Sequence, residues 1–197
     1  MSTSKTRGPY AKGAERREQI IQMATDVFAT DGLDGTALKR VAELVGIREA
    51  TLFHYFRGKQ ELLTAVLRER DARSANLMSE GSLLRALPRM AETNAEQPGL
   101  TALFAVASAV ASDPAHDSHA FFQERYATLV EMLVQDIRDG QTQGRVRRDL
   151  EAETMARIVI AAFDGLQLQW LYDKSVNMAD GLLDVIVVLL TREEPQI

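Results

Sequence analysis

The chain has 197 residues, a net charge of −5, a 46% share of hydrophobic residues and no cysteine. This length suits one long domain or two small ones that share an interface, and the hydrophobic share is ordinary for a soluble protein with a core. The lack of cysteine excludes disulfides and thiolate chemistry. No apolar run is long enough to span a bilayer, and the polar, basic start lacks the apolar segment of a signal peptide, so we expect a cytoplasmic protein.

The first predicted element is a flexible basic arm over residues 1–14. Apolar residues then recur at helical spacing from about 15 to 30, and a glycine ends that helix. Thr36 is a plausible N-cap of a second helix. A third helix runs from about 48 to 56, and a fourth opens at Lys59.

Every later segment also looks helical, and no β pattern, internal repeat or metal-finger spacing competes with that reading. Pro88 should kink the first of these helices or mark its true start. The sequence therefore predicts an all-α fold of about nine helices. The later helices are predicted over 83–94, 100–111, 118–141, 151–172 and 178–191.

The charge is unevenly distributed along the chain. Residues 1–70 hold 12 Lys and Arg against 9 Asp and Glu, whereas residues 71–197 hold 11 against 19. Such asymmetry suggests that the first part meets a polyanion, with chance as the alternative for so small a surplus. Within the arm, Lys5, Arg7 and Lys12 could reach the minor groove or phosphates, or could form a solubilising tail.

The most informative stretch is residues 36–59, TALKRVAELVGIREATLFHYFRGK. It reads as two short helices joined by a tight turn, with a small residue, a turn residue and a buried apolar residue where a helix-turn-helix needs them. Ala42, Gly46 and Leu52 occupy these three places. Gly46 can take the positive φ that strains a residue with a Cβ. The second helix could then lie in the major groove of DNA.

That second helix would present polar side chains to base edges. Arg48 can form two hydrogen bonds with guanine and Thr51 can offer a methyl group to thymine, with His54 on the same face. Thr36 and Lys59 lie at helix N-termini, where backbone N–H groups attract phosphate. The alternative is that these are simply exposed polar residues of a small helix.

The first four predicted helices together resemble the tetracycline-repressor (TetR) family. The resemblance is strongest over 15–67, and the total length and the all-helical remainder also fit it. It implies a homodimer with a C-terminal domain that binds small molecules, and 163–171 looks like the penultimate helix of one branch of the family. The matching motif comprises Thr36, Val41-Ala42, Gly46-Ile47, Thr51-Leu52-Phe53, Tyr55-Phe56, Lys59 and Leu62-Leu63.

The resemblance also implies that Tyr55 and Lys59 hold the DNA backbone, with a core aromatic as the alternative for Tyr55. Many members carry Tyr where Phe53 stands, so a phenol cannot donate to phosphate there, and His54 or Tyr55 would take part of that role. Phe53 and Phe56 are expected in the core. The predicted DNA contacts are Thr36, Arg48, Glu49, Thr51, His54, Tyr55 and Lys59.

The C-terminal helices are expected to supply an effector pocket and a dimer interface. A mostly apolar cavity with a few polar groups suits a small hydrophobic or amphipathic effector. Gly165 costs stability inside a helix, which a close helix crossing at the dimer axis would explain. The apolar residues of 182–190 cover more than one face, which favours burial against a partner. The alternatives are an ordinary filled core and a last helix buried within its own subunit. The predicted effector-binding residues are Met90, Phe104, Phe122, Tyr126, Phe163, Gln167 and Trp170.

Metal binding and catalysis have less support. His116 and His119 have a spacing that can place two ligands on one helix face, but no third strong ligand stands at a motif spacing. The stretch is better explained by Asp117 or Ser118 capping the next helix. Glycine-rich phosphate loops, nucleophile elbows and paired-carboxylate motifs are missing from the sequence. We therefore expect no metal, no cofactor and no enzyme activity.

The sequence thus predicts a basic arm at 1–14, a helix-turn-helix DNA-binding domain at 15–60 and a ligand-binding and dimerisation domain at 61–197. The leading hypothesis is a homodimeric transcriptional repressor that releases a palindromic operator when it binds a small effector. The main alternative is a DNA-binding protein controlled by a protein partner, which a sealed C-terminal core would favour. A helical enzyme would need a cavity with a convergent acid–base pair.

Overall fold

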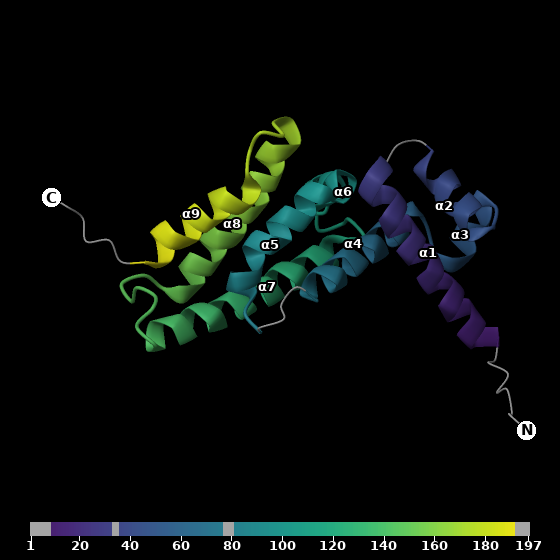
Figure 1. The fold of residues 1–197 in the computed structure, drawn as a ribbon. Helices are drawn as coiled ribbons and strands as arrows, with labels where there is room; N and C mark the ends of the chain where they lie inside the picture. Colours follow the sequence, from purple (N-terminus) through teal and green to yellow (C-terminus); the bar gives the residue numbers. More distant parts are fainter. Residues whose placement is uncertain (1–8, 33–35, 77–80, 192–197) are drawn as a thin grey trace, which may run out of the picture.

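The computed structural model describes residues 9–32, 36–76 and 81–191, which form nine helices and no strand (Figure 1). The first three helices make a head at one end of an elongated molecule, and the last two pack together at the other end (Figure 1). The predicted all-α fold is therefore confirmed. The helices are α1 (Pro9–Asp31), α2 (Ala37–Val45), α3 (Glu49–Tyr55), α4 (Lys59–Ala75), α5 (Leu83–Glu96), α6 (Pro98–Val110), α7 (His119–Thr142), α8 (Ala152–Tyr172) and α9 (Met178–Leu190).

Helix α1 begins earlier than the sequence pattern predicts. It starts at Pro9, so residues 9–14 of the predicted arm are helical. Proline suits the first position of a helix, because its fixed φ is already helical and its missing N–H would have no partner there. Lys12 is consequently an exposed residue of α1, whereas Lys5 and Arg7 lie outside the described residues.

The turn between α2 and α3 has the predicted left-handed glycine. Gly46 has φ 76° and ψ 38°, and the N–H of Ile47 donates to the carbonyl of Ala42 at 2.9 Å. This conformation would destabilise a residue with a Cβ by roughly 1–2 kcal/mol. The glycine therefore lets α2 end and α3 leave in a new direction within a few residues, as a helix-turn-helix requires.

One hydrophobic core joins the head to the middle of the chain. It includes Ile20 and Phe28 of α1 and Leu52 of α3, which have no exposed surface, and it continues through Phe104 of α6 and Phe121 of α7. The head and the helices behind it thus share a single interior. A large side chain removed from this interior would disturb both parts.

Helices α1 and α6 approach each other most tightly at Gly99. A Cβ built on Gly99 would lie 1.9 Å from the carbonyl oxygen of Phe28 and 2.7 Å from the backbone nitrogen of Gly32. Both neighbours are backbone atoms, which cannot rotate away as a side chain can. Glycine is therefore the residue that permits the head to contact α6 at this distance.

A second hydrophobic core lies among α5, α7, α8 and α9. Its most buried members are Leu133 and Ile137 of α7, Met155 and Val159 of α8, and Leu182 of α9. Pro88 lies inside α5 and does not mark its start. Ser82 caps that start, and its hydroxyl accepts a hydrogen bond from the N–H of Arg85. Among the described helices, none is both long and apolar enough to cross a membrane.

Candidate DNA interface and effector site

Helix α3 presents part of the predicted DNA-binding set to solvent. Arg48 precedes the helix in an extended conformation, and Arg48, Glu49 and His54 are exposed. Thr51 and Tyr55 are half-buried, and the ring of Tyr55 packs against the core of the head. Arg48 and His54 are thus available to a partner, whereas Thr51 and Tyr55 offer only part of their surface.

The structure corrects the placement of Phe53. Leu52 and Phe56, four residues apart, both face the core with 0% and 2% of their surface exposed. Residues four apart share one helix face, so these two fix the rotation of α3 and leave Phe53 on the outer side with 40% exposed. The expectation that Phe53 is a core residue is therefore wrong, and the same expectation for Phe56 is confirmed.

The predicted phosphate-positioning residues lie where two helices begin. Thr36 occupies the N-cap position of α2, and Lys59 is the first residue of α4; both are exposed. The first-turn N–H groups of these helices have no carbonyl partner within the helix, which makes each end favourable for an anion. The start of α3 lies between them in the sequence, so residues 36–59 contain three helix N-termini.

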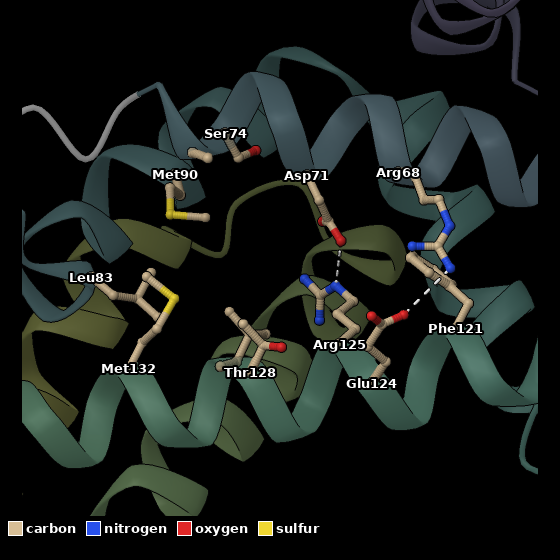
Figure 2. A pocket seen from close by; sticks show the side chains of 12 residues that line it. Arg68, Asp71, Ser74, Leu83, Met90, Phe121, Glu124, Arg125, Thr128 and Met132 are labelled. Atoms are coloured by element: carbon tan, nitrogen blue, oxygen red, sulfur yellow. Dashed lines mark hydrogen bonds and ion pairs between the residues drawn. The ribbon is translucent and has the colours of Figure 1, made fainter.

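A cavity of about 330 Å³ lies between α4, α5 and α7 (Figure 2). One end is apolar, and Leu83, Met90 and Met132 line it (Figure 2). The other end is charged, with Arg68 and Asp71 from α4 facing Glu124 and Arg125 from α7 (Figure 2). Because Glu124 and other lining residues are exposed, the cavity opens to the surface between α4 and α7.

Ion pairs join α4 to α7 at the charged end of the cavity. The Nε of Arg125 donates to Oδ2 of Asp71 at 2.8 Å, and the guanidinium of Arg68 lies 3.5 Å from the carboxylate of Glu124. Arg125 is well buried, with 11% of its side chain exposed, and its Nη1 has no hydrogen-bond partner among the described residues. The charged end therefore contains a buried donor that the described protein leaves unused.

A buried polar network continues behind this charged end. Arg70 of α4 is 5% exposed, and its Nη2 donates to Asn94 at 3.0 Å and to Gln167 at 3.2 Å. Burial lowers the pKa of Arg70 to about 10, with the nearby Asp71 opposing the effect, so the guanidinium stays charged at neutral pH. The network links α4 to α5 and α8.

A hydrogen bond between Tyr126 of α7 and Asp164 of α8 lies beside this network. The hydroxyl of Tyr126 donates to Asp164 at 2.7 Å. Burial, followed by the charge of Asp164, raises the pKa of Tyr126, and burial likewise raises the pKa of Asp164. Their hydrogen bond stabilises the carboxylate that burial would otherwise disfavour.

Of the seven predicted effector residues, only Met90 lines this cavity. Phe104 and Phe122 fill the shared core with ring centroids 5.7 Å apart, and Phe163 and Trp170 belong to the second core. Tyr126 donates a hydrogen bond to Asp164, and Gln167 accepts one from Arg70. These six residues do not line this cavity, and their part in effector binding stays a prediction.

The charged residues of the cavity are not among the effector-binding residues predicted from the sequence. Arg68 and Asp71 are three residues apart on α4, and Glu124 and Arg125 are adjacent on α7. Charges at such positions are usually solvated, so no local signal separates them from surface residues. The signal is tertiary, since Asp71 and Arg125 meet only because α4 and α7 face each other.

The two histidines considered as metal ligands have other neighbours. Nε2 of His116 lies 3.1 Å from the amide nitrogen of Gln60, and Nδ1 of His119 lies 2.8 Å from the carbonyl oxygen of Ala111. The described residues contain no group of three potential ligands. Ser118 does occupy the N-cap position of α7, but its hydroxyl pairs with Thr64 at 2.8 Å.

Comparisons with known proteins agree with this architecture. The family described as bacterial regulatory proteins, tetR family, matches residues 20–66, and the C-terminal part of BetI-type transcriptional repressors matches residues 79–191. The HTH-type transcriptional repressor AcnR of Corynebacterium efficiens is 24% identical over 183 residues, covering 93% of this chain and 96% of AcnR.

Solved structures share the fold at low identity. A putative transcriptional regulator from Saccharomonospora viridis in complex with choline has a TM-score of 0.71 and 24% identity, covering 91% of this chain and all of that one. Thermus thermophilus FadR in complex with lauroyl-CoA has a TM-score of 0.58 and 20% identity, covering 92% of this chain and 98% of FadR. With its helix-turn-helix head and its helical C-terminal part both matched, the chain belongs to the TetR family of DNA-binding transcriptional repressors.

Proposed function

We propose that this protein is a homodimeric repressor that acts in the cytoplasm and releases a palindromic operator when a small effector occupies the cavity between α4, α5 and α7. The observation that carries the proposal is the double role of α4, which packs on the head and also lines the cavity. An effector that changes the position of α4 would change the position of the recognition helix.

The two ends of α4 have different neighbours. Near its start, Leu62, Leu63 and Val66 belong to the core of the head, and Glu61 pairs with Arg17 of α1 at 3.0 Å. Farther along, Asp71 pairs with Arg125 at the charged end of the cavity. A coupling of roughly 1–3 kcal/mol between the two sites would reduce operator affinity about 5- to 150-fold.

The open cavity favours a small effector over control by a protein partner alone. A sealed core would have supported the partner hypothesis, whereas the cavity of about 330 Å³ falls within the range of small-molecule sites. Regulators of similar fold hold choline and lauroyl-CoA, which differ greatly in size and charge. The fold therefore accommodates effectors, and the residues of the cavity decide which ones.

An exposed apolar surface on α8 and α9 supports dimerisation. On α8, Leu168 is 49% exposed and Tyr172 is 88% exposed, and on α9, Val187 and Val188 are 54% and 76% exposed. Gly165 lies on α8, and apart from its own helix backbone and chain neighbours no atom of the described residues lies within 4 Å of a Cβ built there, so no close crossing within the subunit accounts for it. A symmetric partner would cover these residues and could approach closely at the glycine.

Selection of bound duplexes from a random DNA pool tests the proposed function. A dimer with two recognition helices should enrich inverted half-sites centred about 10–10.5 base pairs apart, or a multiple of that spacing. The selected duplex, labelled with a fluorophore, then provides the operator for affinity measurements and for a screen of releasing metabolites. Enrichment of no common sequence, or of a single half-site bound by one subunit, would contradict the proposal.

Replacing Arg48 with alanine should weaken operator binding and leave the dimer intact. Arg48 is exposed at the start of the recognition helix, where a bidentate contact to guanine is worth roughly 1–3 kcal/mol. We expect at least a fivefold rise in Kd by fluorescence anisotropy and a relaxed preference at one base of each half-site. The matched control is Arg138→Ala on α7, which removes an exposed arginine outside the head and should change neither quantity.

Replacing Phe53 with tyrosine should strengthen operator binding. Phe53 is 40% exposed on α3, so an added hydroxyl can extend toward DNA without entering the core. A new hydrogen bond to phosphate is worth roughly 0.5–1.5 kcal/mol, so one such bond from each of the two subunits corresponds to about a 5- to 150-fold lower Kd. The gain should be the same for operator and non-operator duplexes, because phosphate contacts are independent of sequence. Equal affinities of Phe53→Tyr and the unchanged protein would show that this position does not reach the backbone.

A further inference from the structure

The unmet hydrogen-bonding capacity of Arg125 indicates what kind of effector the cavity takes. Buried donors in proteins are normally satisfied, and one that is not needs an explanation. The Nη1 of Arg125 is the buried side-chain donor without a partner among the described residues, and Arg125 lines the cavity. Figure 2 shows its guanidinium facing the space between α4 and α7 that continues toward Met90 and Met132.

The acidic groups of the cavity, by contrast, already have partners. Asp71 accepts from Nε of Arg125 at 2.8 Å and lies 3.7 Å from Nη1 of Arg70. Glu124 lies 3.5 Å from Arg68. An incoming cation would have to compete with arginines for these carboxylates. An incoming anion would compete only with Asp71 for Arg125, whose Nη1 holds no bond among the described residues, and charge-assisted bonds from arginine to carboxylate are among the strong ones.

The packing around Arg125 holds its side chain in place for such a bond. Its Cζ lies 4.7 Å above the ring of Phe104, while Asp71 fixes the Nε. A guanidinium stacked on an aromatic ring and bonded on one edge is restricted in orientation. The remaining N–H groups are therefore already directed before a ligand arrives, which reduces the entropy lost on binding.

The rest of the cavity is apolar and small. Leu83, Met90 and Met132 form the end away from the charges (Figure 2). Its volume of about 330 Å³ is near the lower end of the range for small-molecule sites, roughly 300–1,000 Å³. A ligand with one anionic group and a short apolar body would satisfy both ends at once, since the methionines adapt to its shape.

We propose that the effector is a small amphipathic monocarboxylic acid whose carboxylate accepts hydrogen bonds from Arg125 and whose apolar part lies among Leu83, Met90 and Met132. This inference rests on the proposed function, because it names the ligand class of the same cavity. The bound carboxylate would lie beside Asp71 and compete for the charge of Arg125. Weakening of the Asp71–Arg125 pair would loosen the contact between α4 and α7. Because α4 also packs on the head, its movement would change the position of the head.

The experiment compares ligands that share a chain and differ in charge. Isothermal titration calorimetry of the full-length protein is performed with octanoate, octanol and octyltrimethylammonium, and shorter and longer straight-chain carboxylates extend the series. Octanoate or a neighbour in the carboxylate series should bind at least tenfold more tightly than the alcohol and the cation of the same chain. Tighter binding of the alcohol or the cation, or no binding by any carboxylate, overturns the proposal.

Three variants locate the binding. Arg125→Met keeps the bulk but removes the donors, and it should weaken carboxylate binding at least tenfold while leaving alcohol binding unchanged. Met132→Trp fills the apolar end, keeps Arg125 and should weaken both. Arg138→Met, an exposed arginine of the same helix, is the matched control and should weaken neither. Unchanged carboxylate affinity in a folded Arg125→Met, or in Met132→Trp, overturns the assignment.

Operator release separates this inference from the function on which it rests. If the protein binds its selected operator and only a cationic or neutral ligand releases it, the proposed function stands and the carboxylate inference fails. If carboxylates bind through Arg125 but the protein prefers no DNA sequence, the ligand assignment stands and the regulatory function fails.

Discussion

Replacing Gly99 with alanine is expected to destabilise the whole protein, although the change adds a single methyl group. That methyl would lie 1.9 Å from the carbonyl oxygen of Phe28 and 2.8 Å from the Cα of Gly32, so α1 and α6 must separate to admit it. Overpacking of this kind costs about 1–3 kcal/mol and can cost more when backbone must move. For a chain of this size, each kcal/mol lowers the Tm by roughly 2–4 °C.

Differential scanning calorimetry of Gly99→Ala and Gly13→Ala provides the measurement and its control. Gly13 lies inside α1, and a Cβ there meets no atom of the described residues within 4 Å. Alanine at Gly13 should be neutral or stabilising by about 0.5–1 kcal/mol, since glycine is costly within a helix. A Gly99→Ala protein that melts with or above the unchanged protein would show that the α1–α6 contact is looser than described.

Replacing Val188 with glutamate is expected to convert the proposed dimer to monomers. Val188 is 76% exposed on α9, so a charged side chain should be harmless to the fold of one subunit. In a twofold interface formed by this surface, the same patch occurs on both subunits, and each would bury an unpaired carboxylate. Uncompensated buried charges cost roughly 3–5 kcal/mol, which raises the dimer Kd at least about a hundredfold.

Sedimentation equilibrium gives the dimer Kd directly, with circular dichroism as a check that the subunit remains folded. Val188→Thr is the matched control, because it keeps the branched shape without the charge and should stay dimeric. The monomer produced by Val188→Glu should also bind the full operator far more weakly than the dimer does, because a monomer contacts a single half-site. A Val188→Glu protein that remains a tight dimer would place the interface elsewhere.

Local signals in the sequence were sufficient for the helices and the recognition turn. The left-handed conformation of Gly46 follows from the short connection between two amphipathic segments, and the predicted helix ends agree closely with the structure except at the start of α1. The start of α1 also has a local signal, which is Pro9. The basic, polar composition of the segment masked that signal. A basic, polar segment resembles a flexible tail until its proline is considered as a first helical residue.

The rotation of α3 and the cavity could not be predicted in this way. Phe53 and Phe56 are both aromatic, and only the burial of Phe56 with Leu52 decides which of the two faces outward. The cavity depends on Asp71 and Arg125, which are 54 positions apart and meet across two helices. Sequence patterns favour bulky residues as pocket candidates, yet such residues fill the interior, and the opening remains where charged side chains hold α4 and α7 together.

The continuous core between the head and α6 also limits how this protein can be divided. The apolar residues that complete the head include Leu100, Leu103 and Phe104, which come far later in the chain than the recognition helix. A fragment ending after α3 would leave these contacts open to water and should not fold by itself. Exchange of DNA specificity between relatives is therefore best attempted by grafting surface positions of α3, because a transplanted head would lack part of its own interior.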